Sequence, residues 1–241
     1  MKLAVITDNF FLLEEFKKII ENKKKLVTDI KYFASPKSSN KLMDNTVKII
    51  SLKDEWYKLS DRDIVFSLHC KQIFPSELVR TVTCINIHPG LNPYNRGWFP
   101  QVFAINNGMP HGATIHIMDE EIDHGDIIAQ VEVKIFEHDT SKSVYERTIK
   151  SEIELLDDEF ESILTGKYST TPMQNNGNYN CISDFNHICN IDMDRKGTFR
   201  DFYNLLRSLT HEPYKNGYFY NDDGDKVYLS LNIEISKSLV K

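Results

Sequence analysis

The apolar positions in the first 88 residues gather into short runs that polar segments separate. Five such runs are "KLAVIT", "DIKYFAS", "VKIISL", "DIVFSLH" and "CINIH". Short apolar runs without strict alternation are typical of strands that are buried on both faces, as in a parallel sheet. Between the first two runs, apolar residues from Phe11 to Ile20 recur at helical spacing. The pattern therefore predicts an α/β fold with a mostly parallel sheet.

The middle of the chain predicts two more strands and two more helices. "FPQVFAINNG" reads as a helix that Pro100 begins and Gly108 ends. "HGATIHIMD" alternates apolar and polar side chains, and the acidic turn "EEIDHG" joins it to a second strand, "DIIAQVEVKI". "HDTS" then offers an N-cap for a long amphipathic helix whose apolar face runs from Val144 to Ile163.

The C-terminal part of the chain differs in composition from the rest. "TGKYSTTPMQNNGNYN" is rich in Asn, Thr and Gly and predicts a surface connection. Beyond it, "TFRDFYNLLRSL" predicts a helix, and "GYFYN" and "KVYLSLNIEI" predict two strands joined by the turn "NDDGD". We therefore divide the chain into a main domain (1–168), a connecting segment (169–192) and a C-terminal helix and β-hairpin region (193–241). So small a region needs a surface to pack on, either the main domain or a partner subunit.

Charge, hydropathy and cysteine usage narrow the class of protein. The 29 basic and 35 acidic residues give a net charge of −6, which disfavours binding to a nucleic-acid backbone. No run of about 18 apolar residues is present, so no membrane span is expected. Asp8 and Glu14 interrupt the N-terminal apolar run, which therefore predicts a first strand rather than a cleavable signal. The four cysteines form no CxxC pair and no zinc-like spacing, and together these features indicate a reducing cytoplasm.

Candidate chemistry begins where the run "CINIH" ends. Asn86 and His88 are two apart, so a strand places both side chains on one side, at the sheet edge where ligands of open parallel sheets bind. A carboxylate could join them from the acidic turn between the two later strands. An amide, an imidazole and a carboxylate form a working set for acyl transfer, because the first two can bind an oxyanion and the third orients the imidazole.

Two other interpretations of these residues stay open at this point. An isolated Asn-x-His is more often structural than catalytic, and the acidic turn is then a solvated loop. A metal site could draw on His111, His116, Asp119, His124 or Asp126, but no HExxH pattern is present and alternation scatters the two strand histidines. We therefore expect no metal.

A resemblance to a known family favours the first interpretation. "INIHPG...P...RG...P" followed by "HGATIHIMDEEIDHGDII" resembles the 10-formyltetrahydrofolate-dependent formyltransferases, over about residues 2–164. The resemblance implies a Rossmann-like formyltransferase domain and the catalytic residues Asn86, His88 and Asp123. His88 is then expected to take the proton of the attacking amine, with its basicity set by Asp123, while Asn86 binds the oxyanion.

A narrower likeness concerns the acceptor. "NPYNRGWFPQVFAI" and the tail "FRDFYNLLRSLTHEPYKNGYFY" look like sugar-nucleotide N-formyltransferases. This implies 10-formyltetrahydrofolate as donor and a dTDP-linked amino-dideoxy sugar as acceptor, here taken as dTDP-4-amino-4,6-dideoxyglucose. It further implies a cytoplasmic homodimer that serves O-antigen (lipopolysaccharide) or other surface-polysaccharide synthesis, with no nucleic-acid or membrane partner.

The same resemblance implies two sets of binding residues. Those expected to meet the reduced folate are Leu68, His69, Cys70, Lys71, Ile73, Asp119, Glu120, Glu121 and Ile122. Those expected to meet the sugar nucleotide are Tyr94, Asn95, Arg96, Gly97, Trp98, Phe99, Arg207, Tyr214 and Tyr218. One departure concerns the folate set, because "SLHCKQIFP" stands where the family carries a Gly-rich turn.

Three alternatives remain for the function. The chain could formylate another amine, such as that of a dTDP-3-amino sugar or glycinamide ribonucleotide, or it could hydrolyse formyl-folate. It could also be a non-catalytic folate-binding or nucleotide-binding protein, although binding alone does not require Asn86, His88 and Asp123. The basic C-terminal domain of methionyl-tRNA enzymes is missing, which argues against a tRNA substrate.

Overall fold

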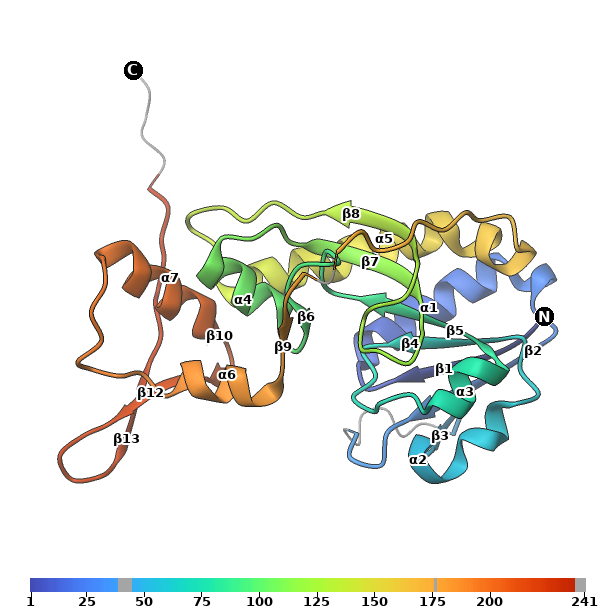
Figure 1. Cartoon of the computed structure of the whole chain (residues 1–241), viewed down its shortest axis with the longest axis horizontal. Coiled ribbons are helices and arrows are strands. Elements are labelled where there is room, and N and C mark those ends of the chain that lie inside the picture. The colour runs from blue at the N-terminus through green and yellow to red at the C-terminus, as the bar shows by residue number, and fades with distance from the viewer. Residues whose placement is uncertain (39–44, 176, 237–241) are drawn as a thin grey trace, which may run out of the picture.

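A seven-stranded sheet forms the centre of the molecule in the computed structural model, which describes residues 1–38, 45–175 and 177–236 (Figure 1). Its strand order is β3-β2-β1-β4-β5-β7-β8. The five parallel strands are β1 (Lys2–Thr7), β2 (Asp29–Ala34), β3 (Val47–Ile49), β4 (Ile64–Leu68) and β5 (Thr83–His88). β7 (Gly112–Ile117) and β8 (Ile127–Glu132) are antiparallel additions. The predicted mostly parallel sheet is confirmed.

Helices cover both faces of this sheet. α1 (Phe10–Asn22) and α5 (Ser141–Thr165) pack on one face, where Phe16, Phe66 and Phe160 meet with ring centroids 5.4–5.8 Å apart. α2 (Leu52–Glu55), α3 (Ser76–Thr81) and the short 3-10 turn η3 (Trp56–Leu59) lie against the other face. A further 3-10 turn, η1 (Lys24–Leu26), follows α1. Burial on both faces explains why the strands are continuous apolar runs.

The helix boundaries follow local signals in the sequence. The side chain of Asn9 accepts a hydrogen bond from the Leu12 N–H and caps α1. Thr140 and Ser143 form a reciprocal capping box at the start of α5. α4 (Pro100–Asn107) begins at its proline and ends at Gly108, whose φ of 72° suits glycine. The predicted boundaries of α4 and the predicted N-cap of α5 are confirmed.

The C-terminal region lies to one side of the sheet (Figure 1). It contains α7 (Phe199–Leu209), the short strands β10 (Thr210–His211) and β11 (Tyr214–Lys215), and a hairpin of β12 (Gly217–Tyr220) and β13 (Lys226–Leu229). Val102 of α4 and Leu205 and Leu209 of α7 share an apolar cluster, so the region packs on the main domain. The predicted helix and hairpin are confirmed, and the hairpin turn is closed by the Asn221 side chain.

One helix was not predicted. α6 (Ile182–Cys189) lies in the segment that the sequence indicated as a connection, just after β9 (Tyr179–Asn180). Its start is marked by Asp184, which accepts a hydrogen bond from the Cys181 N–H. Ile182, Phe185 and Cys189 do recur at helical spacing, but eight residues are too few for this period to be distinguished from an irregular segment.

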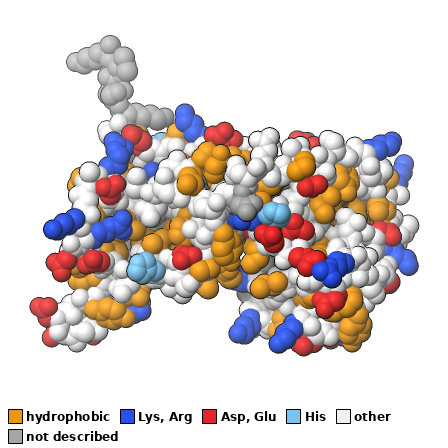
Figure 2. All heavy atoms as spheres, viewed as in Figure 1, with side chains coloured by type: hydrophobic (Ala, Val, Ile, Leu, Met, Phe, Trp, Pro, Cys, Tyr) orange, Lys and Arg blue, Asp and Glu red, His pale blue; other side chains and the backbone are white. Residues whose placement is uncertain are grey.

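Two further features are the distribution of surface charge and the hydropathy of the helices. Acidic and basic side chains are interspersed over the face seen in Figure 2, without a broad basic patch. Among the helices of the described residues, none is both long and apolar enough to cross a membrane.

Candidate active site

Asn86 and His88 are among the last three residues of strand β5, which lies between strands β4 and β7. Asn86 lies opposite Ser67 of β4 and His116 of β7, and His88 lies opposite Thr114 of β7. Both side chains are buried. The strand ending therefore holds an amide and an imidazole side by side at the carboxyl edge of the sheet, as predicted.

The third residue, Asp123, reaches them from the loop between β7 and β8. The Asn86 side-chain amide donates a hydrogen bond to Asp123 Oδ1 at 2.9 Å. His88 Nδ1 is 3.5 Å from Asp123 Oδ2, and the Gly97 N–H donates to that same oxygen at 3.0 Å. The structure thus brings the three predicted residues together and adds a backbone donor. Asp123 has a φ of 49°, a left-handed conformation that costs a non-glycine residue about 1 kcal/mol or more.

A fourth polar side chain, His116, was considered in the sequence only as a metal ligand. Its Nδ1 is 2.9 Å from the Ile117 carbonyl oxygen, which can only accept, so Nδ1 carries the hydrogen. Nε2 is then an acceptor, and it lies 3.3 Å from the Asn86 amide nitrogen. The Asn86 amide therefore directs its two hydrogens at Asp123 and His116. This contact depends on the pairing of β7 with β5, which the local sequence pattern does not indicate.

Burial controls the charge of the cluster. Burial lowers the pKa of His88 to about 4, although the Asp123 carboxylate opposes the shift. Burial also disfavours the charged form of Asp123, but His88, His116 and the Gly97 N–H together hold the pKa of that carboxyl well below its usual range. The resting cluster is a neutral imidazole beside a carboxylate. The basicity that Asp123 was expected to confer on His88 is outweighed by desolvation.

Glycine at position 90 makes room for the His88 imidazole. A Cβ at Gly90 would lie 2.4 Å from His88 Nε2, too close for any side chain. Nε2 itself is buried, and it has no hydrogen-bond partner within the part of the chain that the structure describes. An unpaired buried nitrogen costs about 1–3 kcal/mol. A reacting group that hydrogen-bonds Nε2 would recover that energy.

The loop after β5 holds the acidic turn in place. Asn92 donates its side-chain amide to the Asp123 carbonyl at 2.8 Å, and Arg96 Nη1 donates to the Ile122 carbonyl at 2.9 Å. Arg96 is buried, and Gly97 supplies the N–H to Asp123. Arg96 and Gly97, which the resemblance assigned to the acceptor, thus also hold the loop and carboxylate of Asp123 in place.

The segment 177–180 returns to this loop, which the sequence did not predict. Arg96 and Gly97 form strand β6, which pairs with β9. Asn95 Oδ1 accepts from the side-chain amides of Asn107 and Asn178 at 2.8 and 2.7 Å. A Cβ at Gly97 would lie 2.5 Å from the Asn180 carbonyl oxygen, so only glycine permits this approach. Asn178 of the asparagine-rich segment thus ties that segment to the loop after β5.

The remaining predicted acceptor residues lie in different surroundings. Tyr94 and Trp98 are half-buried in the loop, while Phe99 packs on Phe185 of α6 with ring centroids 4.2 Å apart. Arg207 is buried and donates Nη1 to the Phe136 and Asp139 carbonyls. In the tail, Tyr214 is 68% exposed.

Tyr218 lies on β12 in an aromatic group of the hairpin. Its ring stacks edge-on against Tyr220 and Tyr228, and Lys226 Nζ lies 3.9 Å from its centroid. A contact of Tyr218 with the sugar nucleotide stays a prediction.

The residues predicted to meet the folate form two loops. Leu68 is the buried last residue of β4; after it, His69 has a φ of 52°, the Lys71 N–H donates to Asp8, and Ile73 is 75% exposed. Burial raises the pKa of the Cys70 thiol to about 12. In the acidic turn, Asp119 pairs with His124 at 2.7 Å and Glu120 with Arg80, while Glu121 and Ile122 are exposed.

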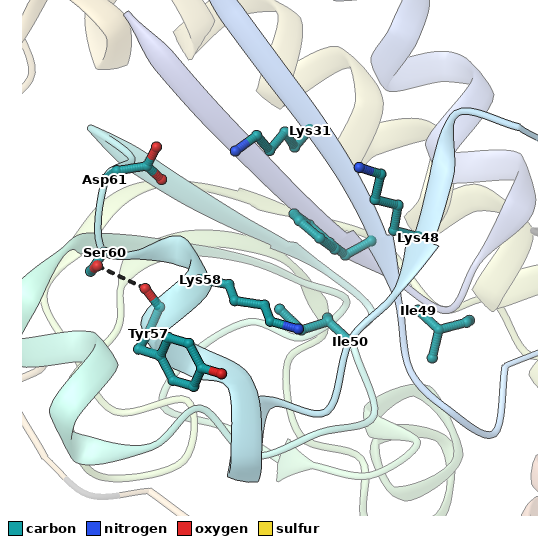
Figure 3. A pocket seen from close by; sticks show the side chains of 9 residues that line it. Lys31, Lys48, Ile49, Ile50, Tyr57, Lys58, Ser60 and Asp61 are labelled. Carbon is teal, nitrogen blue, oxygen red and sulfur yellow. Dashed lines mark hydrogen bonds between the residues drawn. The ribbon is translucent and has the colours of Figure 1, made fainter.

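A hollow of about 580 Å³ lies at the β3 edge of the sheet, beside β2, β3 and η3 and away from β5 (Figure 3). Lys31, Lys48, Lys58 and Tyr57 line it (Figure 3). Among the described residues, none of those predicted for catalysis or binding lines this hollow. Nor do the described residues contain a group of three or more His, Cys, Asp or Glu that could hold a metal ion.

An amide, an imidazole and a carboxylate at the carboxyl edge of a parallel sheet form an arrangement that can stabilise a developing oxyanion. The model of the family described as "Formyl transferase" matches residues 20–159, and that described as "N-formyltransferase dimerization C-terminal domain" matches residues 184–235. The first match alone spans more than half of the chain. The chain belongs to the formyl transferase family and is an N-formyltransferase.

Named relatives agree with this assignment. A dTDP-4-amino-4,6-dideoxyglucose formyltransferase of Mycobacterium tuberculosis is similar, with 46% identity over 175 residues, 73% of this chain and 75% of that protein. A 4-N formyltransferase from Francisella tularensis has a similar crystal structure, with a TM-score of 0.93, 46% identity and 98% coverage of both chains. A sugar N-formyltransferase from a Shewanella species gives a TM-score of 0.94 at 43% identity, covering 98% of this chain and 99% of that one.

Proposed function

We propose that the protein transfers the formyl group of 10-formyltetrahydrofolate to the amine of a dTDP-linked amino-dideoxy sugar, dTDP-4-amino-4,6-dideoxyglucose. The observation that carries the proposal is the cluster of Asn86, His88 and Asp123, joined at 2.9 and 3.5 Å. The acceptor is supported by the names of the Mycobacterium and Francisella relatives, which specify a 4-amino sugar and a 4-N transfer.

The reaction begins with attack of the neutral amine nitrogen on the formyl carbon. The carbonyl oxygen becomes an oxyanion, which the Asn86 amide stabilises. Both hydrogens of that amide have protein partners at rest, and the contact with His116 at 3.3 Å is the longer of the two. We infer that the amide exchanges the His116 contact for the oxyanion, because the Asp123 contact is charge-assisted and stronger.

His88 accepts a proton from the tetrahedral intermediate and later returns it. The nitrogen that has attacked carries a positive charge and is a strong acid, so even a weakly basic imidazole can take its proton. The Asp123 carboxylate, 3.5 Å from Nδ1, then stabilises the imidazolium. Returning that proton to N10 of the folate lets the carbon–nitrogen bond break and leaves the formamide on the sugar.

Each of the two substrates is assigned to loops that border the cluster. The folate is assigned to the backbone after β4 and to the acidic turn from Asp119 to Ile122, where exposed Ile73 and Ile122 offer apolar surface. The sugar nucleotide is assigned to the loop from Tyr94 to Phe99 and to Tyr214 and Tyr218 of the tail. Arg207 is assigned to the pyrophosphate through the part of its guanidinium that faces away from the Phe136 and Asp139 carbonyls.

The cellular setting follows from the acceptor. A formylated dTDP-sugar is a precursor for surface polysaccharide such as O-antigen. We assign the formyl transfer that makes it, with a reduced folate as donor, to the cytoplasm. A homodimer is supported by the family description of the C-terminal region.

The test is a formyl-transfer assay with purified protein, 10-formyltetrahydrofolate and a panel of dTDP-linked 3-amino and 4-amino sugars plus glycinamide ribonucleotide. We expect the 4-amino sugar to gain the mass of one carbonyl group and to give the highest kcat/KM. Preference for another amine would overturn the choice of acceptor. Transfer to none of them would overturn the proposed function.

A further inference from the structure

Glu152 is a buried acid that the catalytic cluster does not use. It lies on α5, is fully buried, and both of its carboxylate oxygens are near His69 Nε2, at 2.9 and 3.0 Å. Leu12, Leu68, Ile87 and Leu156 line the small apolar hollow beside it. Burial raises the pKa of Glu152, which makes its ionised form depend on the single imidazole that it contacts.

The hydrogen bonds around this pair run in one direction. Asn9 Oδ1 accepts from the Leu12 N–H, so its Nδ2 is the atom that donates to the Tyr145 hydroxyl oxygen at 3.1 Å. Tyr145 then directs its own hydrogen at His69 Nδ1, 3.4 Å away. His69 is left with its hydrogen on Nε2, facing the Glu152 carboxylate. Asn9, Tyr145, His69 and Glu152 thus form a relay that is ready to receive a proton at the Tyr145 oxygen.

The relay lies next to the catalytic cluster. His69 directly follows β4, and Leu68 is paired with Ile87, the residue before His88. A positive charge on His69 lowers the pKa of His88, so the two imidazoles are electrostatically close. On its other side, the Tyr145 ring is 5.5 Å from His211, which is 5.7 Å from Tyr214 of the tail. The relay therefore connects the cluster with the region assigned to the acceptor.

The proposed reaction needs such a group because of its proton balance. An amino sugar near neutral pH is an ammonium ion, and it loses two protons on its way to a formamide. One of them returns to N10 of the folate, and His88 can carry it. The other must leave before attack, and a buried imidazole with a pKa of about 4 is a poor base toward an ammonium ion.

We propose that the His69–Glu152 pair, acting through the Tyr145 hydroxyl, takes this first proton from the acceptor ammonium group. The ammonium N–H bond breaks, the proton passes to the Tyr145 oxygen, and the Tyr145 hydrogen passes to His69 Nδ1. The imidazolium that forms is paired with the Glu152 carboxylate and later releases the proton to water. This inference rests on the proposed function, because it assigns a role in activating the same amine.

The titratable groups that face His69 are Glu152 and Tyr145 of α5 and His88 of β5, with His211 of β10 beyond Tyr145. The Glu152 carboxylate is the group placed to pair with a cation at His69, since both of its oxygens lie within 3.0 Å of Nε2.

The test compares pH profiles of kcat/KM for the amino sugar. Tyr145→Phe removes only the relay oxygen, and Glu152→Gln removes the charge but keeps an acceptor for His69 Nε2. We expect both variants to react only through free amine, so that their rates fall tenfold per pH unit below the pKa of the amine. The loss relative to wild type is about 100-fold near pH 6.5 and small near pH 9. His111→Gln is the matched control, because His111 is a buried histidine bonded to Thr148 on the same helix.

The outcomes separate the inference from the function on which it rests. Profiles of both variants that run parallel to the wild type would overturn the relay, as would a His69 that carries its hydrogen on Nδ1 in ¹⁵N NMR spectra of the wild-type enzyme. We expect the Nε2–H form, and a His111→Gln profile parallel to the wild type. A wild-type protein that formylates no amine would instead overturn the proposed function itself.

Discussion

Asp123 stabilises the candidate site through three contacts at once. Its two carboxylate oxygens meet the Asn86 amide, His88 and the Gly97 N–H. Asp123→Asn keeps an oxygen for one of these donors but removes the charge that stabilises the imidazolium. We expect kcat to fall about 100-fold or more while the fold is kept.

Steady-state kinetics and a thermal melt check this prediction. Asp126→Asn, in the same loop but exposed, is the control and should stay within about twofold of the wild type. An Asp123→Asn variant with more than a tenth of the wild-type kcat would contradict the role assigned to the carboxylate.

Buried histidines also predict how stability changes with pH. Burial lowers the pKa of His88 to about 4 and that of His111 to about 3, below the ordinary value of about 6.5. The unfolded chain therefore binds more protons than the folded one between about pH 6.5 and 4, and both histidines destabilise the fold as the pH falls through that window. Glu152 acts in the opposite direction, because its folded pKa is raised.

The contribution of one histidine can be isolated. His111→Gln should reduce the slope of unfolding free energy against pH by up to about 1.4 kcal/mol per pH unit between pH 6.5 and 5. Urea titrations at several pH values measure this slope. Equal slopes in the variant and the wild type would show that His111 is not held neutral by burial.

The residues of the site differ in how far their roles could be predicted. Asn86 and His88 were accessible because alternation along a strand places them together, and Asp123 because a motif linked it to them. The role of His116 depends on which strand lies beside β5, and that of Glu152 on how helix α5 faces the sheet. Such pairings are tertiary and leave no mark in the local pattern. The net charge state of His88 likewise depends on burial, which the sequence pattern indicates only in outline.

At the scale of secondary-structure elements, the pairing of β6 with β9 shapes the site. Gly97 has a φ of 89°, and a Cβ there would lie 2.5 Å from the Asn180 carbonyl oxygen. Gly97→Ala should cost about 2–3 kcal/mol of stability. It should also lower kcat, because the strand that moves carries the N–H bonded to Asp123.

Gly108→Ala is the matched control for this change. Its φ of 72° is also left-handed, but a Cβ at Gly108 meets no described atom within 4 Å. It should cost about 1 kcal/mol and leave kcat unchanged. If the two variants lose equal stability and equal activity, the β6–β9 contact does not position Asp123.

The elements of the sheet were predicted better than those that join the loop to the tail. Apolar runs and caps mark β1 to β5, α4 and α5, since burial and helix-end chemistry are local properties. β6, β9 and α6 are short, and contacts of Asn95, Asn178 and Phe185 across the molecule hold them in place. Since tertiary contacts stabilise these short elements, the local hydrophobic pattern alone does not predict them.

At the scale of the whole molecule, the C-terminal region has more apolar surface than one chain covers. Phe199 is 87% exposed at the start of α7, and Tyr220 and Tyr228 are exposed on the hairpin. Within the described residues β13 pairs only with β12, so its outer edge is open. A two-stranded hairpin is marginal alone, and a second copy of this chain would cover both features.

We therefore expect a homodimer joined through this region, in keeping with its family description. Phe199→Asp keeps the Thr198 cap and adds a favourable charge in the first turn of α7, so the helix should remain. Tyr228→Asp places a charge on the open strand. Each variant should shift the mass in solution from dimer to monomer by light scattering, with unchanged far-UV circular dichroism.

Tyr57→Asp is the control for this dimer prediction, because Tyr57 is exposed on the opposite edge of the sheet beside the lysine-lined hollow. It should leave the dimer intact. A monomeric wild-type protein, or a dimer that both tail variants leave unchanged, would place the subunit contact elsewhere. Since the tail packs on α4, which follows the acceptor loop, loss of the dimer should raise KM for the sugar nucleotide more than KM for the folate.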